Sequence, residues 1–188
     1  MTREVADLQE RQRLLTGALV SVRKPTIAAL PGPAVGAGLA IGDGLRHPHR
    51  RAIGIPSPPA TCEVGLSGDY GIAWLLTRLV GTSRARELMF TCREGRCGQR
   101  ARRSAWSTAW CPTTELQAEA FALAKSMAEG PTIAIRYMKD NLDEALMFDF
   151  ATARDHEAER MVRAQVTADH REAVQAFIEK RKPVFRGN

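Results

Sequence analysis

The sequence predicts an α/β protein whose second half is helical, and three observations carry this prediction. A short apolar run at residues 26–30 is bounded by prolines and has the length of a buried strand. A glycine-rich turn at 31–38 follows it and leads into apolar residues that begin a helix. From residue 113 onward, apolar residues recur at helical spacing almost without interruption.

The elements of the first half follow from local signals. Residues 3–23 carry apolar side chains at helical spacing and predict an amphipathic helix, which ends before Pro25. Residues 63–81 run from a turn into a helix whose C-terminal cap is Gly81. A further helix is expected over 83–90. In the first of these two helices, an apolar stripe predicts core positions at Trp74, Leu75 and Leu79.

In the second half, the helix boundaries rest on capping residues. Thr114 and Asp169 are candidate N-caps, and Pro131 suits a first helical position. We therefore expect a partial α/β core over 1–112 and a helical region over 113–188. His156 and His170 lie in charged helical segments and are not expected to bind a ligand. Acidic residues near Arg154 and Arg160 predict local ion pairs on a solvated face.

Length and composition limit the class of protein to which this chain can belong. The chain has 188 residues, of which 44% are hydrophobic and 26% charged, values that are typical of a folded domain. No apolar run approaches the roughly 18–20 residues that span a bilayer, and the polar start is unlike a signal peptide. These features predict a cytoplasmic protein that has no membrane partner.

The charge is unevenly distributed. Segments 43–62 and 92–111 carry +2 and +4, which together make the whole net charge of +6, and they hold all four cysteines. The cysteines lack the paired spacing of a zinc site, and we expect no metal. The arginine-rich stretch could bind nucleic acid or attract anionic phosphates. Because charge runs are more often solvated faces, we expect no nucleic-acid partner.

Four blocks of sequence resemble a known protein family. They are KPTIAALPGPAVGAGLAI, VGLSGDYG with LLTRLVGTSRARELMFT, GPTIAIRYMKDNLDEAL and DHREAVQAFIEKRKPVFRG. In order and spacing they resemble the enoyl-CoA hydratase/isomerase (crotonase) family. The resemblance implies a spiral of ββα turns with a helical C-terminal region that assembles homo-trimers or hexamers. It also implies an acyl-CoA thioester as substrate, with no separate cofactor because coenzyme A is part of that substrate.

The resemblance also implies a site. Family members polarise the thioester carbonyl with two backbone N–H groups, and the second donor falls on Ala37. Its neighbours Val35, Gly36 and Gly38 are then expected at the substrate. The alternative is a structural role, in which the glycines of this turn allow close packing of a strand against a helix. The two glutamates of true hydratases fall on Ala40 and near Thr61, so the hydratase carboxylate pair is missing.

One acidic residue does match a catalytic position. Asp69 coincides with an aspartate that dienoyl-CoA isomerases and some aryl-CoA members use, and a carboxylate there would act as base or nucleophile. The alternative is a helix N-cap. Near the C-terminus, Phe177 and Lys180 match a segment that helps hold the adenine and phosphate of coenzyme A. The alternative for these two residues is packing and surface charge.

The departures from the family matter as well. Nothing before Lys24 resembles the family's N-terminal strands, which carry the other oxyanion donor, so the resemblance predicts an N-terminally truncated member. Segments 43–62 and 92–111 have the right length but foreign residues, and we interpret them as frame-shifted. Two alternatives to an enzyme follow: an impaired acyl-CoA-binding or assembly remnant, and a chain that does not fold stably.

Overall fold

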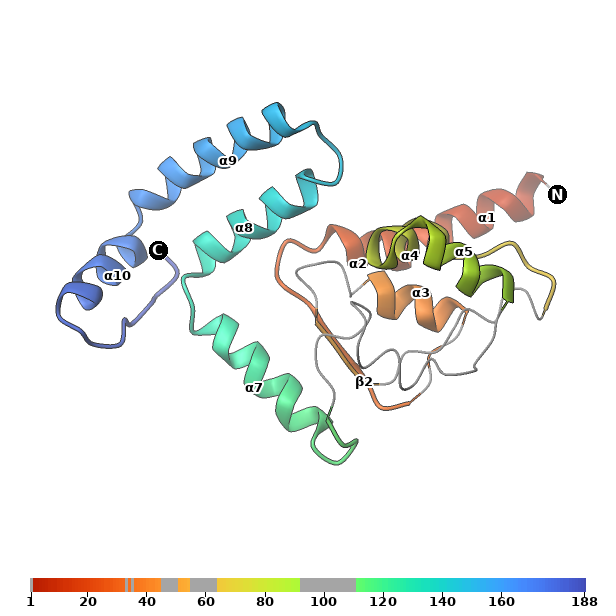
Figure 1. Ribbon diagram of the computed structural model, residues 1–188, viewed down its shortest axis with the longest axis horizontal. Helices are drawn as coiled ribbons and strands as arrows, with labels where there is room; N and C mark the ends of the chain where they lie inside the picture. The colour runs from red at the N-terminus through yellow and green to blue at the C-terminus, as the bar shows by residue number, and fades with distance from the viewer. Residues whose placement is uncertain (1, 33, 35, 45–50, 55–63, 92–110) are drawn as a thin grey trace. The chain divides into compact units, whose positions relative to one another are not determined.

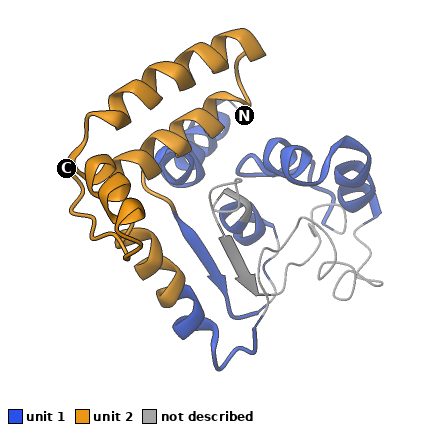
Figure 2. Cartoon of the chain, turned by 60° about the vertical axis from the view of Figure 1, so that its left-hand side comes forward, with its two compact units in different colours: residues 1–22, 26–120 blue, residues 23–25, 121–188 orange. Residues whose placement is uncertain are grey.

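The computed structural model describes residues 2–32, 34, 36–44, 51–54, 64–91 and 111–188 (Figure 1). The chain forms two compact units (Figure 2). One unit, blue in Figure 2, comprises residues 1–22 and 26–120; the other, orange, comprises 23–25 and 121–188. Most of the two segments interpreted as frame-shifted lies outside the described residues.

The first unit begins with the predicted helix, which contains a wide turn. Helix α1 spans Thr2–Gln12, a π-helical turn spans Arg13–Gly17, and α2 spans Ala18–Ser21. Gln12 and Ala18, on either side of the turn, have helical backbone angles, so the helix is continuous. The predicted helix is confirmed. None of the residues of α1 is buried, so its apolar face is not covered by the described residues.

A β–α–β unit follows. Strand β1 (Ile27–Leu30) and strand β2 (Arg51–Gly54) are parallel neighbours, with Ile27 opposite Arg51. Helix α3 (Ala37–Gly44) lies between them in the chain, as parallel strands require a crossover connection (Figure 1). The predicted strand is confirmed. The helix starts slightly earlier than its apolar residues suggested.

Helices α4 (Ile72–Val80) and α5 (Thr82–Thr91) are separated by Gly81, whose positive φ of 80° ends α4 as predicted. They pack with α3 around one buried apolar cluster: Leu39, Ala40, Ile72, Leu76, Ala85 and Leu88. The core prediction for Trp74 is wrong, because its side chain is 42% exposed. Its ring instead supports the Arg78 guanidinium, whose central carbon lies 3.7 Å from the ring centroid.

The second unit is helical. Helix α7 (Leu116–Ala128) crosses the boundary between the two units in the chain, and α8 (Thr132–Glu144), α9 (Phe150–Gln165) and α10 (Ala168–Ile178) follow. Pro131 stands just before the first helical residue rather than at it. No helix among the described residues is long and apolar enough to cross a membrane.

One predicted N-cap is wrong and another was missed. The hydroxyl of Thr167, not the carboxylate of Asp169, caps α10 by accepting the N–H of His170. Asp149 caps α9 by accepting the N–H groups of Ala151 and Thr152. Asp169 has a different role: it is buried, and its oxygens accept backbone N–H groups from the C-terminal tail.

Candidate functional site

The start of α3 has the geometry of an anion-binding turn. Gly36 has a φ of 53°, which favours glycine, and Ala37 is the first residue of the helix. The N–H of Ala40 donates to the carbonyl of Gly36 at 3.0 Å. N–H groups in the first turn of a helix have no partner within the helix, and they lie at the positive end of its dipole. The Ala37 N–H is in this first turn.

The glycines of this turn are not explained by crowding. Among the described residues, no atom lies within 4 Å of the position that a Cβ would take at Gly36 or at Gly38. Close strand–helix packing would place backbone or side-chain atoms there. The described residues therefore do not fill the space beside these two glycines, which favours a ligand over packing. Val35 lies outside the described residues.

The position of the first hydratase glutamate is a packed core position. Ala40 is fully buried and belongs to the apolar cluster with Leu39 and Ile72. Its methyl group supplies no acid or base. The second hydratase position, near Thr61, and the neighbouring Glu63 lie outside the described residues, and Thr61 has no carboxylate.

Asp69 lies on a turn of unusual backbone geometry. Three residues of this turn have positive φ: Gly68 at 131°, Tyr70 at 47° and Gly71 at 79°. The N–H of Ile72 donates to the backbone carbonyl of Asp69 at 3.0 Å, which locks the turn to the start of α4. The N-cap of α4 is Gly71, with no side-chain hydrogen bond, so the capping alternative for Asp69 is wrong.

One oxygen of the Asp69 carboxylate accepts no hydrogen bond from the described residues. Its Oδ1 atom is buried and has no hydrogen-bond partner among the described residues. Buried polar atoms are nearly always hydrogen-bonded, so an exception calls for a reason such as catalysis or an absent ligand. Ala40 and Ile72 share one cluster, and Ala37 and Asp69 each precede one of them by a single turn. The same core therefore fixes both candidate site residues.

The two C-terminal candidates lie in the other unit. Phe177 is on α10 and is 84% exposed, so the described residues leave most of its side chain uncovered. Lys180 follows the helix with a φ of 54°, is exposed, and donates its N–H to the carbonyl of Phe177 at 3.3 Å. The structure places these two residues next to each other. An exposed phenylalanine beside a lysine is compatible with the expected contact to adenine and phosphate.

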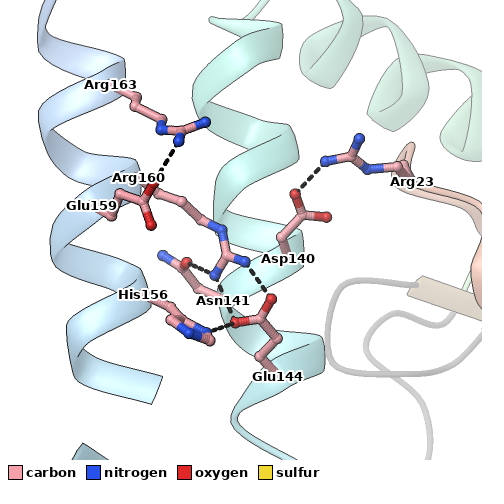
Figure 3. A network of polar contacts seen from close by, with 8 residues as sticks. All are labelled: Arg23, Asp140, Asn141, Glu144, His156, Glu159, Arg160 and Arg163. Atoms are coloured by element: carbon pink, nitrogen blue, oxygen red, sulfur yellow. Dashed lines mark hydrogen bonds and ion pairs between the residues drawn. The ribbon is translucent and has the colours of Figure 1, made fainter. Parts of the chain in front are cut away.

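A polar network between α8 and α9 was not foreseen (Figure 3). Arg160 pairs with Glu144 of α8 rather than with an acid on its own helix, and it also donates to Asn141 at 2.8 Å. His156 Nδ1 lies 2.8 Å from Glu144 Oε2. The hydrogen bond from Arg160 lowers the pKa of Glu144 against the opposing effect of burial. This network joins two helices of one unit, so we assign it a structural role.

Side chains of the kinds that bind metals are scattered over the part of the chain that the structure describes. There, no three His, Cys, Asp or Glu side chains come together as a metal site requires. Cys92 and Cys97 lie outside that part. Cys111 is among the described residues, where it is half-buried and forms no disulfide. Burial raises the pKa of its thiol.

Comparison with known proteins gives one consistent result. The family model for enoyl-CoA hydratase/isomerase matches residues 1–188. The 1,2-epoxyphenylacetyl-CoA isomerase of Escherichia coli K12 is 32% identical over 173 residues. The short-chain-enoyl-CoA hydratase of Clostridium acetobutylicum is 29% identical over 164 residues. The crystal structure of an enoyl-CoA hydratase/isomerase from Cupriavidus metallidurans CH34 is 30% identical, with a TM-score of 0.82.

These matches cover most of this chain but a smaller share of each relative. The match to the isomerase covers 90% of this chain and 64% of the isomerase. The match to the hydratase covers 86% of this chain and 61% of the hydratase. For the crystal structure the shares are 97% of this chain and 69% of that chain. The chain thus spans less than two thirds of the length of the first curated relatives it matches. The expected crotonase-like fold is confirmed.

Proposed function

Because the chain belongs to the enoyl-CoA hydratase/isomerase family, we propose that it binds an acyl-CoA thioester and stabilises the enolate of that thioester. The backbone N–H of Ala37 donates to the thioester oxygen as negative charge develops there. Preorganised donors of this kind act most strongly in the transition state, because they need no rearrangement as the charge appears. The open space beside Gly36 and Gly38 supports this placement.

The proposed reaction is movement of a double bond rather than hydration. Hydration needs one group to activate water and another to protonate carbon, and the two hydratase positions carry alanine and threonine. A single carboxylate suffices for isomerisation. Asp69 removes a proton from C2 of a 3-enoyl-CoA, and the C–H electron pair forms a dienolate. Asp69 then returns the proton to C4, which leaves the conjugated 2-enoyl-CoA.

The observation that carries the proposal is the buried Oδ1 of Asp69, which has no hydrogen-bond partner among the described residues and belongs to a constrained turn. A carboxylate oxygen that accepts no hydrogen bond from the described residues is suited to accept a proton from bound substrate. One relative is named 1,2-epoxyphenylacetyl-CoA isomerase, while others are named enoyl-CoA hydratases, so the choice of isomerisation rests on the residues of this chain. In this proposal Phe177 and Lys180 contact the adenine and phosphate ends of coenzyme A, which is the only cofactor moiety and enters with the substrate.

The proposal includes self-association into homo-trimers or hexamers through the helical half. Large apolar side chains there are exposed, and a second copy of the chain would cover them. Apart from Phe177, the most exposed are Phe121, Phe150 and Val166. Sedimentation of the purified chain tests this assembly, and a monomer at all concentrations contradicts it.

The reaction is tested by the appearance of conjugated 2-enoyl-CoA from 3-hexenoyl-CoA, and by deuterium uptake at C4 of this product in heavy water, which occurs when the proton held by Asp69 exchanges with solvent. We expect Asp69→Asn to lower turnover about 100- to 10,000-fold, the usual contribution of a positioned acid–base group. Asp155→Asn is the matched control, because Asp155 is exposed on α9 and pairs only with Arg154 among the contacts described for it. Saturable thioester binding without turnover in the wild-type chain would overturn the proposal in favour of a binding remnant.

A further inference from the structure

Tyr70 adopts a backbone conformation that residues with a side chain seldom take. Its φ is 47°, in the left-handed region, where a Cβ approaches the following carbonyl oxygen. Residues 68, 70 and 71 all have positive φ. Gly68 and Gly71 have no Cβ and therefore no steric clash in this conformation, whereas Tyr70 has a side chain. Such strain persists only where the surrounding structure over-determines the conformation, and it concentrates at functional sites.

The surroundings of Tyr70 show what holds this conformation. Its half-buried ring packs against the apolar cluster that α3, α4 and α5 share. A turn of four residues with three positive φ values would otherwise rearrange easily. The ring ties the middle of the turn to the core, and the hydrogen bond from Ile72 to Asp69 ties its end to α4.

Asp69 makes the second attachment through its own carbonyl, and it directly precedes Tyr70 in the chain. Its Oδ1 is buried and has no hydrogen-bond partner among the described residues. We propose that Tyr70 is a positioning residue, whose ring holds the turn in the strained conformation that keeps the Asp69 carboxylate aimed at the substrate. This inference rests on the proposed function of Asp69 as the proton carrier.

Three variants separate positioning from plain stabilisation. Tyr70→Gly accepts a positive φ but removes the ring, so the turn loses its attachment to the core. Tyr70→Phe keeps the ring and removes only the hydroxyl. Leu79→Ala is the matched control, because Leu79 packs against the same cluster from the far end of α4 and lies away from the turn.

With 3-hexenoyl-CoA as substrate, we expect Tyr70→Gly to lower kcat about 10- to 100-fold with little change in KM, since misplacing a reacting group costs rate rather than binding. Tyr70→Phe should keep the wild-type kcat, and Leu79→Ala should keep it while lowering the melting temperature. A loss of kcat in Tyr70→Phe that equals the loss in Tyr70→Gly would overturn the proposal, because the hydroxyl would then be responsible. Equal kcat in Tyr70→Gly and Leu79→Ala would overturn it as well.

A second measurement needs no turnover. Hydrogen exchange of the Ile72 amide reports the turn directly, because that amide donates to Asp69. We expect Tyr70→Gly to speed its exchange about tenfold relative to the Leu76 amide within α4, and Tyr70→Phe to leave it unchanged. Unchanged exchange in Tyr70→Gly overturns the role of Tyr70. Turnover that survives Asp69→Asn overturns the proposed function instead, so the two failures are distinguishable.

Discussion

The carboxylate of Asp169, in the first turn of α10, accepts the backbone N–H of Gly187 at 2.9 Å. It also accepts the N–H of Arg186 at 2.7 Å, and its own N–H donates to the carbonyl of Asn188 at 3.1 Å. With only 3% of Asp169 exposed, this is a buried anchor. The last residues of the chain are thereby closed back onto the helix that precedes them.

The first prediction concerns this anchor. Asp169→Ala leaves two N–H groups without their acceptor, and we expect it to lower the free energy of unfolding by about 1–3 kcal/mol. Asp169→Asn keeps one acceptor oxygen and should cost less. Chemical denaturation measures both, with Glu157→Ala on the exposed face of α9 as the control. If Asp169→Ala is no less stable than this control, the anchor contributes nothing.

The second prediction is a pH dependence. Hydrogen bonds from the Arg181 side chain and the Val184 N–H lower the pKa of Glu172 from 4.5 to about 2. A carboxyl whose pKa is lower in the folded state stabilises the fold above its unfolded pKa, and this contribution is lost as the pH falls through the folded value. The melting temperature of the wild-type chain should therefore exceed that of Glu172→Gln near neutral pH. The difference should shrink from about pH 5 to about pH 2; a gap that is independent of pH contradicts the ion pair.

The third prediction concerns the lost hydratase carboxylate. Restoring it by Ala40→Glu places a larger, ionisable side chain in a fully buried apolar cluster. We expect this variant to be less stable by about 3–5 kcal/mol and to gain no hydration of crotonyl-CoA. Ala73→Glu, the same change at an exposed position of α4, should be nearly neutral. A stable Ala40→Glu that hydrates crotonyl-CoA would show that this position opens onto the substrate.

The fourth prediction tests the turn that carries Asp69. Gly68 has a φ of 131°, and a Cβ there would lie 3.3 Å from Ile72 Cγ2, so Gly68→Ala is both strained and crowded. We expect a loss of about 1–3 kcal/mol in the free energy of unfolding. Gly65→Ala is the comparison, because Gly65 also has a positive φ but no described atom within 4 Å of its Cβ position. Equal losses in the two variants would mean that crowding by Ile72 is unimportant.

Local signals in the sequence predicted much of the fold. Proline and glycine bound the strand at 27–30 and the end of α4, and both features are present in the structure. Signals that depend on distant residues were missed. Thr167 and Asp169 are both suitable N-caps in isolation, and the choice between them depends on backbone N–H groups 17 and 18 residues further along the chain from Asp169.

The candidate site divides in the same way. The positions of Ala37 and Asp69 at the starts of two helical segments followed from the sequence, as did the missing carboxylate at Ala40. The buried oxygen of Asp69 and the packed ring of Tyr70 could not be predicted, because both depend on a cluster built from three helices. A helical stripe also cannot tell which of its members faces solvent, and for this reason Trp74 was placed in the core.

The network between α8 and α9 has a consequence for the order in which the chain folds. Its partners are close in sequence: His156 is 12 residues from Glu144, and Arg160 is 19 residues from Asn141. Contacts of such short range form quickly, because little chain entropy is lost in closing the loop. Arg23, by contrast, meets Asp140 across 117 residues, at 2.6 Å (Figure 3). We expect the α8–α9 hairpin to form early and to present Asp140 on a preformed surface, so that Arg23 joins late in folding.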